Sequence, residues 1–187
     1  MARLSEISAR EDVPQDKRHI FDAIAQSRGT VAVPFSLLLN SAEVAGRVAH
    51  LGTYLRFEST LPAADRELAI LTAARECECD FEWAAHVRWA RRAGVREEAI
   101  DVIGRRLALD TLTPQEALIV QYGRELLVNH RVSLETFEVV RARYGAQGVT
   151  DLTATLGYYS MLACALNAFE VGLAPGASRF PPSEVRE

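Results

Sequence analysis

The chain has 187 residues, of which 49% are hydrophobic and 25% are charged, and its formal net charge at pH 7 is -4. A chain of this length buries roughly two-thirds of its unfolded surface when it folds as one domain. We therefore expect a single domain over residues 1–187, with extended or mobile tails at about 1–13 and 174–187. The acidic balance provides no basic surface for a phosphate backbone, so nucleic acid is not expected as a partner.

The cysteines and the N-terminus indicate where the protein works. Three cysteines without framework spacing argue against a disulfide scaffold and favour a reducing, cytoplasmic location. The N-terminus, MARLSEISAREDVPQDKRH, mixes charges throughout and lacks the apolar region of a signal peptide. No window reaches the roughly 18 uninterrupted apolar residues of a membrane-spanning helix, so no membrane partner is expected.

Two helices are predicted in the first third of the chain. The first follows Pro14 and ends at Arg28–Gly29, because glycine favours a helix stop. The second is capped by Asn40 or Ser41 and runs to Phe57. Its apolar stripe, at spacings of four, three and four residues, consists of Val44, Val48, Leu51 and Leu55. His19 and His50 lie beside the apolar stripes and are expected at the surface.

Most side chains able to do chemistry lie between Glu67 and Gly94. Pro62 opens a helix that carries Glu67 among apolar residues and that ends near residues 76–78. We therefore do not expect the Glu67 carboxylate to be fully exposed to water. A further helix begins at Asp80 and ends at Arg92, before Gly94.

Cys79, Glu82 and His86 share one face of that further helix. Their spacing of i, i+3 and i+7 places them within roughly 60° of one another. An uncompensated buried charge costs several kcal/mol, so ionisable groups gathered on an apolar face indicate a functional site. An alternative remains open, in which Glu82 and His86 form an exposed pair and Cys79 is a small core residue. We take Glu67, Cys79, Glu82 and His86 as the candidate catalytic residues.

Cys79 and Cys164 lie in different helical environments, and we expect them to behave differently. Cys79 lies at the start of a helix, where the positive helix end would lower the pKa of a thiol and make it reactive. Cys164 lies in the helix DLTATLGYYSMLACALNAFEV, which is apolar nearly all round. We expect this helix to be buried, in the protein or against another copy, and Cys164 to be a core residue.

The remaining patterns are helical as well. Thr113-Pro114-Gln115-Glu116 is a capping box and predicts a helix to about Asn129. Ser133 caps the next helix, which ends at Tyr144–Gly145, and the last helix begins at Thr150 or Asp151 and ends near Gly172. No strand alternation extends beyond a few residues. The sequence therefore predicts an all-α fold of seven to nine helices.

The spacing of the candidate residues resembles the signature of a known family. Glu67, eleven residues, Cys79, two residues, Glu82-Trp83, two residues and His86 is similar to the pattern of the carboxymuconolactone decarboxylase family. PFSLLLNSAEVAGRVAHLGTYLR and LGYYSMLACALNAFEVGL also resemble segments of that family. The resemblance implies a helical bundle of the alkylhydroperoxidase D-like type, a small-molecule substrate, and a homo-oligomer, either a trimer or a hexamer.

This chain departs at one position from the pattern of the alkylhydroperoxidase branch, and that position bears on the mechanism. The alkylhydroperoxidase branch carries Cys-x-x-Cys, and this chain has Glu82 where the second thiol would stand. A dithiol mechanism requires two sulfurs within bonding distance. Cys77 could substitute only through a strained bridge across Cys77-Glu78-Cys79. The dithiol mechanism is therefore not favoured.

The resemblance implies a lyase that acts on a small carbonyl, carboxylate or lactone compound, as in removing CO₂ from a carboxylated muconolactone during aromatic-acid catabolism. His86 is then the proton donor, Glu67 orients it or relays its proton, Glu82 balances charge, and Cys79 hydrogen-bonds or traps the substrate. Arg66, Arg75, Arg88 and Arg91 are expected mostly at helix surfaces, so the substrate is expected to be less charged than the family name suggests.

Three other interpretations remain open. A single-cysteine, peroxiredoxin-type antioxidant activity would use Cys79 as the peroxide-attacking thiolate. A metal site is not favoured, because the spacing matches neither paired-cysteine zinc sites nor the Glu-x-x-His of di-iron bundles, and no cofactor is expected. A non-enzymatic protein that retains the fold is the third.

Overall fold

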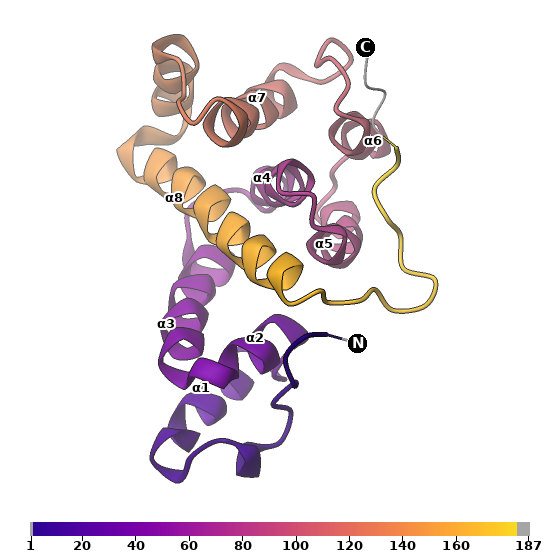
Figure 1. Ribbon diagram of the computed structural model, residues 1–187. Coiled ribbons are helices and arrows are strands. Elements are labelled where there is room, and N and C mark those ends of the chain that lie inside the picture. The colour runs from indigo at the N-terminus through magenta and orange to yellow at the C-terminus, as the bar shows by residue number, and fades with distance from the viewer. Residues whose placement is uncertain (1, 183–187) are drawn as a thin grey trace. The chain divides into compact units, whose positions relative to one another are not determined.

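The computed structural model describes residues 2–182, and within this range it contains helices and no strand (Figure 1). The α-helices are α1 (Arg18–Arg28), α2 (Val33–Leu38), α3 (Ala42–Thr53), α4 (Ala63–Glu76), α5 (Asp80–Arg92), α6 (Glu97–Arg105), α7 (Pro114–Val128) and α8 (Leu134–Ala168). Three short 3-10 helices lie at Arg10–Asp12, Gln15–Lys17 and Leu39–Ser41, and a π-helix, Tyr54–Glu58, extends α3. The predicted all-α fold is confirmed.

The element α8 consists of two helices in succession. Gly145 interrupts it with φ 67° and ψ 179°, a conformation that glycine adopts without the strain of a Cβ atom. The break falls at the predicted end of the helix that Ser133 caps. In the structure, Thr136 N–H donates to Ser133 Oγ over 3.2 Å, which confirms that cap.

The described chain divides into two compact units. The first contains the chain up to Ser59 together with Ala165–Gly172, and the second contains Thr60–Cys164 and the segment from Leu173 onward. The expectation of one domain over residues 1–187 stays a prediction. Residue 1 and residues 183–187, parts of the predicted tails, lie outside the described residues.

The first unit is built on the contact between α1 and α3. An added Cβ at Gly46 would lie 3.0 Å from the Ile20 side chain, so glycine allows the two helices to approach closely. The buried residues of α3 are Ala45, Ala49 and Gly52. The predicted apolar stripe of this helix is therefore wrong except for Leu55. Close packing selects the face with small side chains, and the larger Val44 and Leu51 are left 44% and 45% exposed.

The second unit is built around α4, which packs against α5, α6 and α7 (Figure 1). Every residue from Glu67 to Arg75 is buried, which includes charged side chains at both ends of an apolar run. An added Cβ at Gly123 of α7 would lie 2.8 Å from Thr72, so α7 lies directly against α4. Trp83, Val87 and Ala90 of α5 are buried.

Two further expectations concern α8 and membranes. Leu152, Leu156 and Leu162 are buried, but Cys164 is exposed, so the prediction that it is a core residue is wrong. Cys164 is seven residues from Gly157, also exposed, and both lie on the face of the helix that is not packed. Among residues 2–182, no helix combines the length and apolar character needed to cross a bilayer.

The capping box of α7 gives a stability prediction. Thr113 Oγ1 accepts the Glu116 backbone N–H, and the Glu116 carboxylate accepts the Thr113 backbone N–H. Thr113→Ala should lower the free energy of unfolding by about 1 kcal/mol, measured by urea denaturation. Thr150→Ala is the matched control, because Thr150 is exposed within α8 and alanine is the better helix former. Equal losses in the two variants would contradict the capping role.

Candidate active site

A short turn between α4 and α5 carries the candidate cysteine. Cys77 ends α4, Cys79 is the N-cap of α5, and Glu78 between them has φ 50°, in the left-handed region. Cys79 N–H donates to Ala74 O over 2.8 Å, and Trp83 N–H donates to Cys79 O over 3.1 Å. The turn thus directs the first turn of α5 back beside the end of α4.

His86 lies between two carboxylates. A 2.7 Å hydrogen bond joins His86 Nδ1 to Glu67 Oε2 of α4, and His86 Nε2 is 3.5 Å from Glu82 Oε2 of its own helix. The three side chains are only 4 to 6% exposed. The edge of the Tyr159 ring from α8 also contacts the imidazole, with ring centroids 5.0 Å apart and planes at 82°. A hydrogen bond to Glu67 thus fixes Nδ1, and Glu82 lies within ion-pair distance of Nε2.

Burial of this trio has a chemical consequence. Removing an ion from water costs several kcal/mol unless a partner compensates for it, so buried ionisable groups pair by sharing protons or charge. Here one imidazole can exchange a proton with Glu67 on one side and Glu82 on the other. An arrangement of this kind is suited to general acid–base catalysis.

The Cys79 thiol differs from the sequence prediction. It is 1% exposed, and burial, the largest effect, raises its pKa to about 11, with the nearby Glu82 charge adding to the rise. The backbone amides of Glu82 and Phe81 donate to the sulfur and act in the opposite direction. The predicted fall in pKa is therefore wrong, because loss of water outweighs the helix N-terminus at this position.

The structure brings the four predicted residues together in the second unit. Glu67, His86 and Glu82 form one chain of contacts, and Cys79 joins it through the Glu82 backbone amide. Their catalytic role stays a prediction. Within residues 2–182, no group of three or more His, Cys, Asp or Glu side chains is arranged to hold a metal ion.

Sequence reasoning missed the position of Arg75. This residue was expected at a helix surface, but its side chain is 2% exposed. Its Nε–H donates to Gly104 O over 2.6 Å and its Nη1 to Glu78 Oε1 over 2.9 Å. Arg88 and Arg91 are exposed, as expected. The Glu78 partner is local, but the Gly104 carbonyl comes from α6, and no pattern around position 75 reveals that contact.

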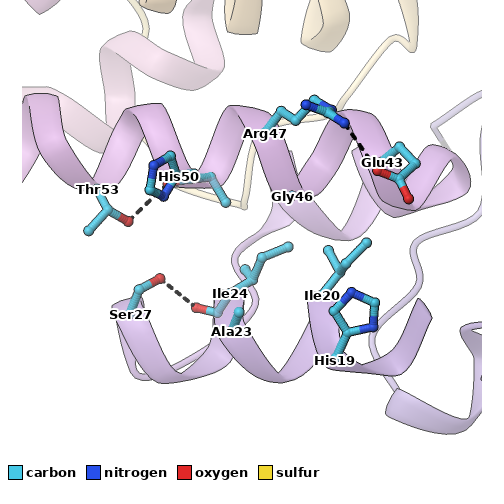
Figure 2. A pocket seen from close by; sticks show the side chains of 11 residues that line it. His19, Ile20, Ala23, Ile24, Ser27, Glu43, Gly46, Arg47, His50 and Thr53 are labelled. Carbon is cyan, nitrogen blue, oxygen red and sulfur yellow. Dashed lines mark hydrogen bonds and ion pairs between the residues drawn. The ribbon is translucent and has the colours of Figure 1, made fainter. Parts of the chain in front are cut away.

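Two surface cavities lie away from these residues. One of about 680 Å³ lies between α1 and α3, where Figure 2 shows Ile20 and Ile24 beneath His50 and Arg47. The other, of about 500 Å³, is lined by α8 residues on both sides of the Gly145 break. None of the four candidate residues lines either cavity. His19 and His50, which line the first, are exposed as predicted.

Comparisons with known proteins bear on the stretch that contains the site. Residues 42–125, which include all four candidates, match the model of the carboxymuconolactone decarboxylase family. The fold is similar to that of an uncharacterized peroxidase-related protein from Silicibacter sp. TM1040, with a TM-score of 0.73 and 14% identity over 96% of each chain.

A second similar structure is a cysteine-to-alanine variant of the debrominase Bmp8 in complex with 2,3,4-tribromopyrrole. Its TM-score is 0.70 at 12% identity, over 94% of this chain and 95% of that one. At these identities the likeness shows a shared fold alone. No curated protein matches the chain.

The burial of Cys79 predicts the order in which the cysteines are alkylated. At pH 8, Cys164 should react with iodoacetamide first, because it is exposed, and Cys79 last. The Cys79 rate should rise about tenfold per pH unit until it levels off near the pKa of about 11, because only the thiolate attacks. Peptide mass spectrometry after timed quenching measures each rate. Preferential labelling of Cys79 at pH 7 would show that its thiol is acidic.

Proposed function

Because this chain carries a domain of the carboxymuconolactone decarboxylase family and has the alkylhydroperoxidase D-like fold, we propose that it is an enzyme catalysing proton transfer on a small carbonyl, carboxylate or lactone compound. The supporting observation is His86, held 2.7 Å from Glu67 and 3.5 Å from Glu82 in a buried environment. An imidazole with one nitrogen fixed by a carboxylate is oriented to donate or accept a proton at the other.

The proposed reaction is a decarboxylation followed by protonation. When the bond to the carboxylate breaks, its electron pair stays on the substrate carbon as an enolate, and CO₂ leaves. Glu67 holds His86 Nδ1, so Nε2 is the nitrogen that transfers a proton, directly or through the Glu82 carboxyl group, to that carbon. The proton is then replaced from solvent, and the site returns to its starting state.

Cys79 has a supporting role in this mechanism. Its pKa of about 11 keeps the thiol protonated at neutral pH, so it donates a hydrogen bond and does not attack as a nucleophile. A neutral thiol donor suits an oxygen that becomes negative as the enolate forms. The proposal therefore assigns acid–base work to His86 and hydrogen bonding to Cys79.

The environment favours a substrate of low charge. A dicarboxylate or tricarboxylate requires cationic partners, and the buried Arg75 already uses Nε and Nη1 on Gly104 O and Glu78. The structurally similar debrominase is bound to tribromopyrrole, a small uncharged ring. We infer that a lactone or a carbonyl compound with a single carboxylate, the group that leaves as CO₂, fits this site better than a highly charged acid.

Substitution of His86 by glutamine tests the proposal. The protein is assayed with 4-carboxymuconolactone and with a β-keto acid, and CO₂ release and deuterium uptake from D₂O are measured. His86→Gln should lower kcat/KM about 10²- to 10⁴-fold, because the proton donor is lost. His50→Gln, a change at an exposed histidine of α3, is the control and should retain full activity. Unchanged turnover in a folded His86→Gln protein would refute the proposal.

Peroxide reduction by Cys79 is the second candidate. Its position at the N-terminus of α5, with two backbone amides on the sulfur, supports it, as does the fold shared with a peroxidase-related protein. In that reaction the thiolate attacks the peroxide O–O bond, giving a sulfenic acid and releasing water or an alcohol, and an external thiol restores the cysteine. The raised pKa of Cys79 works against it.

Limited peroxide treatment separates the two candidates. With one equivalent of hydrogen peroxide at pH 7, mass spectrometry should find Cys79 no more oxidised than Cys164, because the buried thiol is protonated. Alkylation of all thiols before digestion traps the remaining reduced cysteines. Rapid and selective sulfenic acid formation at Cys79 would instead make the peroxidase the better assignment.

A further inference from the structure

Residues 177–182, which follow Gly176 near the C-terminus, form a segment without helix that we name the C-terminal strap. The strap and the residues of α4, α5 and α6 that it contacts all belong to the second unit. The sequence predicted only an extended or mobile tail here, so these contacts are information that the fold adds.

Phe180 anchors the strap on two helices. Its ring lies 4.4 Å from the Arg75 guanidinium of α4, a cation–π contact. It also meets the Trp83 indole of α5 edge to face, with ring centroids 6.2 Å apart and planes at 78°. Arg75 and Trp83 are both buried, so Phe180 packs against a buried cation and a buried aromatic ring.

Asp80 and Gly104 hold the strap on either side of Phe180. Asp80 Oδ1 accepts the Phe180 backbone N–H over 3.3 Å, and Asp80 Oδ2 pairs with Arg179 Nη1 at 3.2 Å. At Gly104 of α6, an added Cβ would lie 2.8 Å from Pro181, so the absence of a side chain there makes room for the proline. The strap therefore contacts α4, α5 and α6 at once.

These contact points bracket the turn that carries the thiol. Arg75 lies just before the turn, and Asp80 follows Cys79 directly. Between them, Glu78 has φ 50°, a left-handed conformation that costs energy in a residue other than glycine and persists only when its surroundings hold it. The strap is thus attached on both sides of this strained turn.

We propose that the C-terminal strap is a closing device that fixes the α4–α5 turn and controls the access of reactants to Cys79. Phe180 and Arg179 are its positioning residues, acting through Arg75, Trp83 and Asp80. Release of the strap frees the turn, and the first turn of α5, which carries Glu82, moves with it.

The attachment is weak enough to open. The Arg179 side chain is 74% exposed, and exposed ion pairs contribute little to stability. Phe180 is only half-buried, and the strap has no helix of its own to lose. Segments with few buried contacts open locally without global unfolding, which is the behaviour that a closing device needs.

The inference concerns access to the site named under the proposed function, and its test requires no substrate. Full-length Phe180→Ala protein is treated with iodoacetamide at fixed pH, and the rate at Cys79 is divided by the rate at exposed Cys164 in the same sample. We expect this ratio to rise about tenfold, because one cation–π and one aromatic contact are lost. Arg179→Ala should raise it about twofold, because only the exposed pair is lost.

Two controls separate local opening from general destabilisation. Phe180→Tyr keeps the ring and should restore the wild-type ratio, and Phe57→Ala removes an equally large but exposed ring and should leave it unchanged. Amide hydrogen exchange should accelerate in residues 80–83 but not in the interior of α7. An unchanged ratio in Phe180→Ala, or equal acceleration in α7, would overturn the closing role. Either result would leave the acid–base proposal for His86 untouched.

Discussion

The hydrogen bond between Glu67 and His86 joins α4 to α5 inside the second unit, 2.7 Å long and almost fully removed from water. A helix as buried as α4 cannot carry an isolated carboxylate, because the desolvation cost would be several kcal/mol. The imidazole compensates for that cost, and Glu82 on its other side completes a trio that can exchange protons. The chemistry proposed for the site depends on this pairing.

The same burial has opposite effects on the two kinds of chemistry that this fold could support. It brings acid and base groups into contact where water does not compete, which favours proton transfer. It also penalises the charged thiolate, so Cys79 at the N-terminus of α5 remains a thiol despite the two backbone amides that donate to it. We therefore propose acid–base catalysis ahead of peroxide reduction, although the helix position of Cys79 suits a redox cysteine.

Much of the architecture could be predicted from local patterns. The turn near residue 78, the capping box at Thr113 and the break at Gly145 each depend on a few neighbouring residues, and each lies where the sequence predicts it. Expectations that required knowledge of packing partners were less successful. The face of α3 that is buried follows from Gly46 against Ile20, and the burial of Arg75 follows from Gly104 of α6 and Phe180 of the strap.

By itself, the sequence determined that Glu82 and His86 occupy one face of a helix that begins just after Cys79, because helical spacing is a property of consecutive residues. It also determined that Glu67 lies on an apolar helix. Only the tertiary structure decided that Glu67 is hydrogen-bonded to His86, that the Cys79 thiol is buried and weakly acidic, and that Cys164 is exposed. Each of these depends on which distant segments exclude water from a side chain, and that is set by packing between helices.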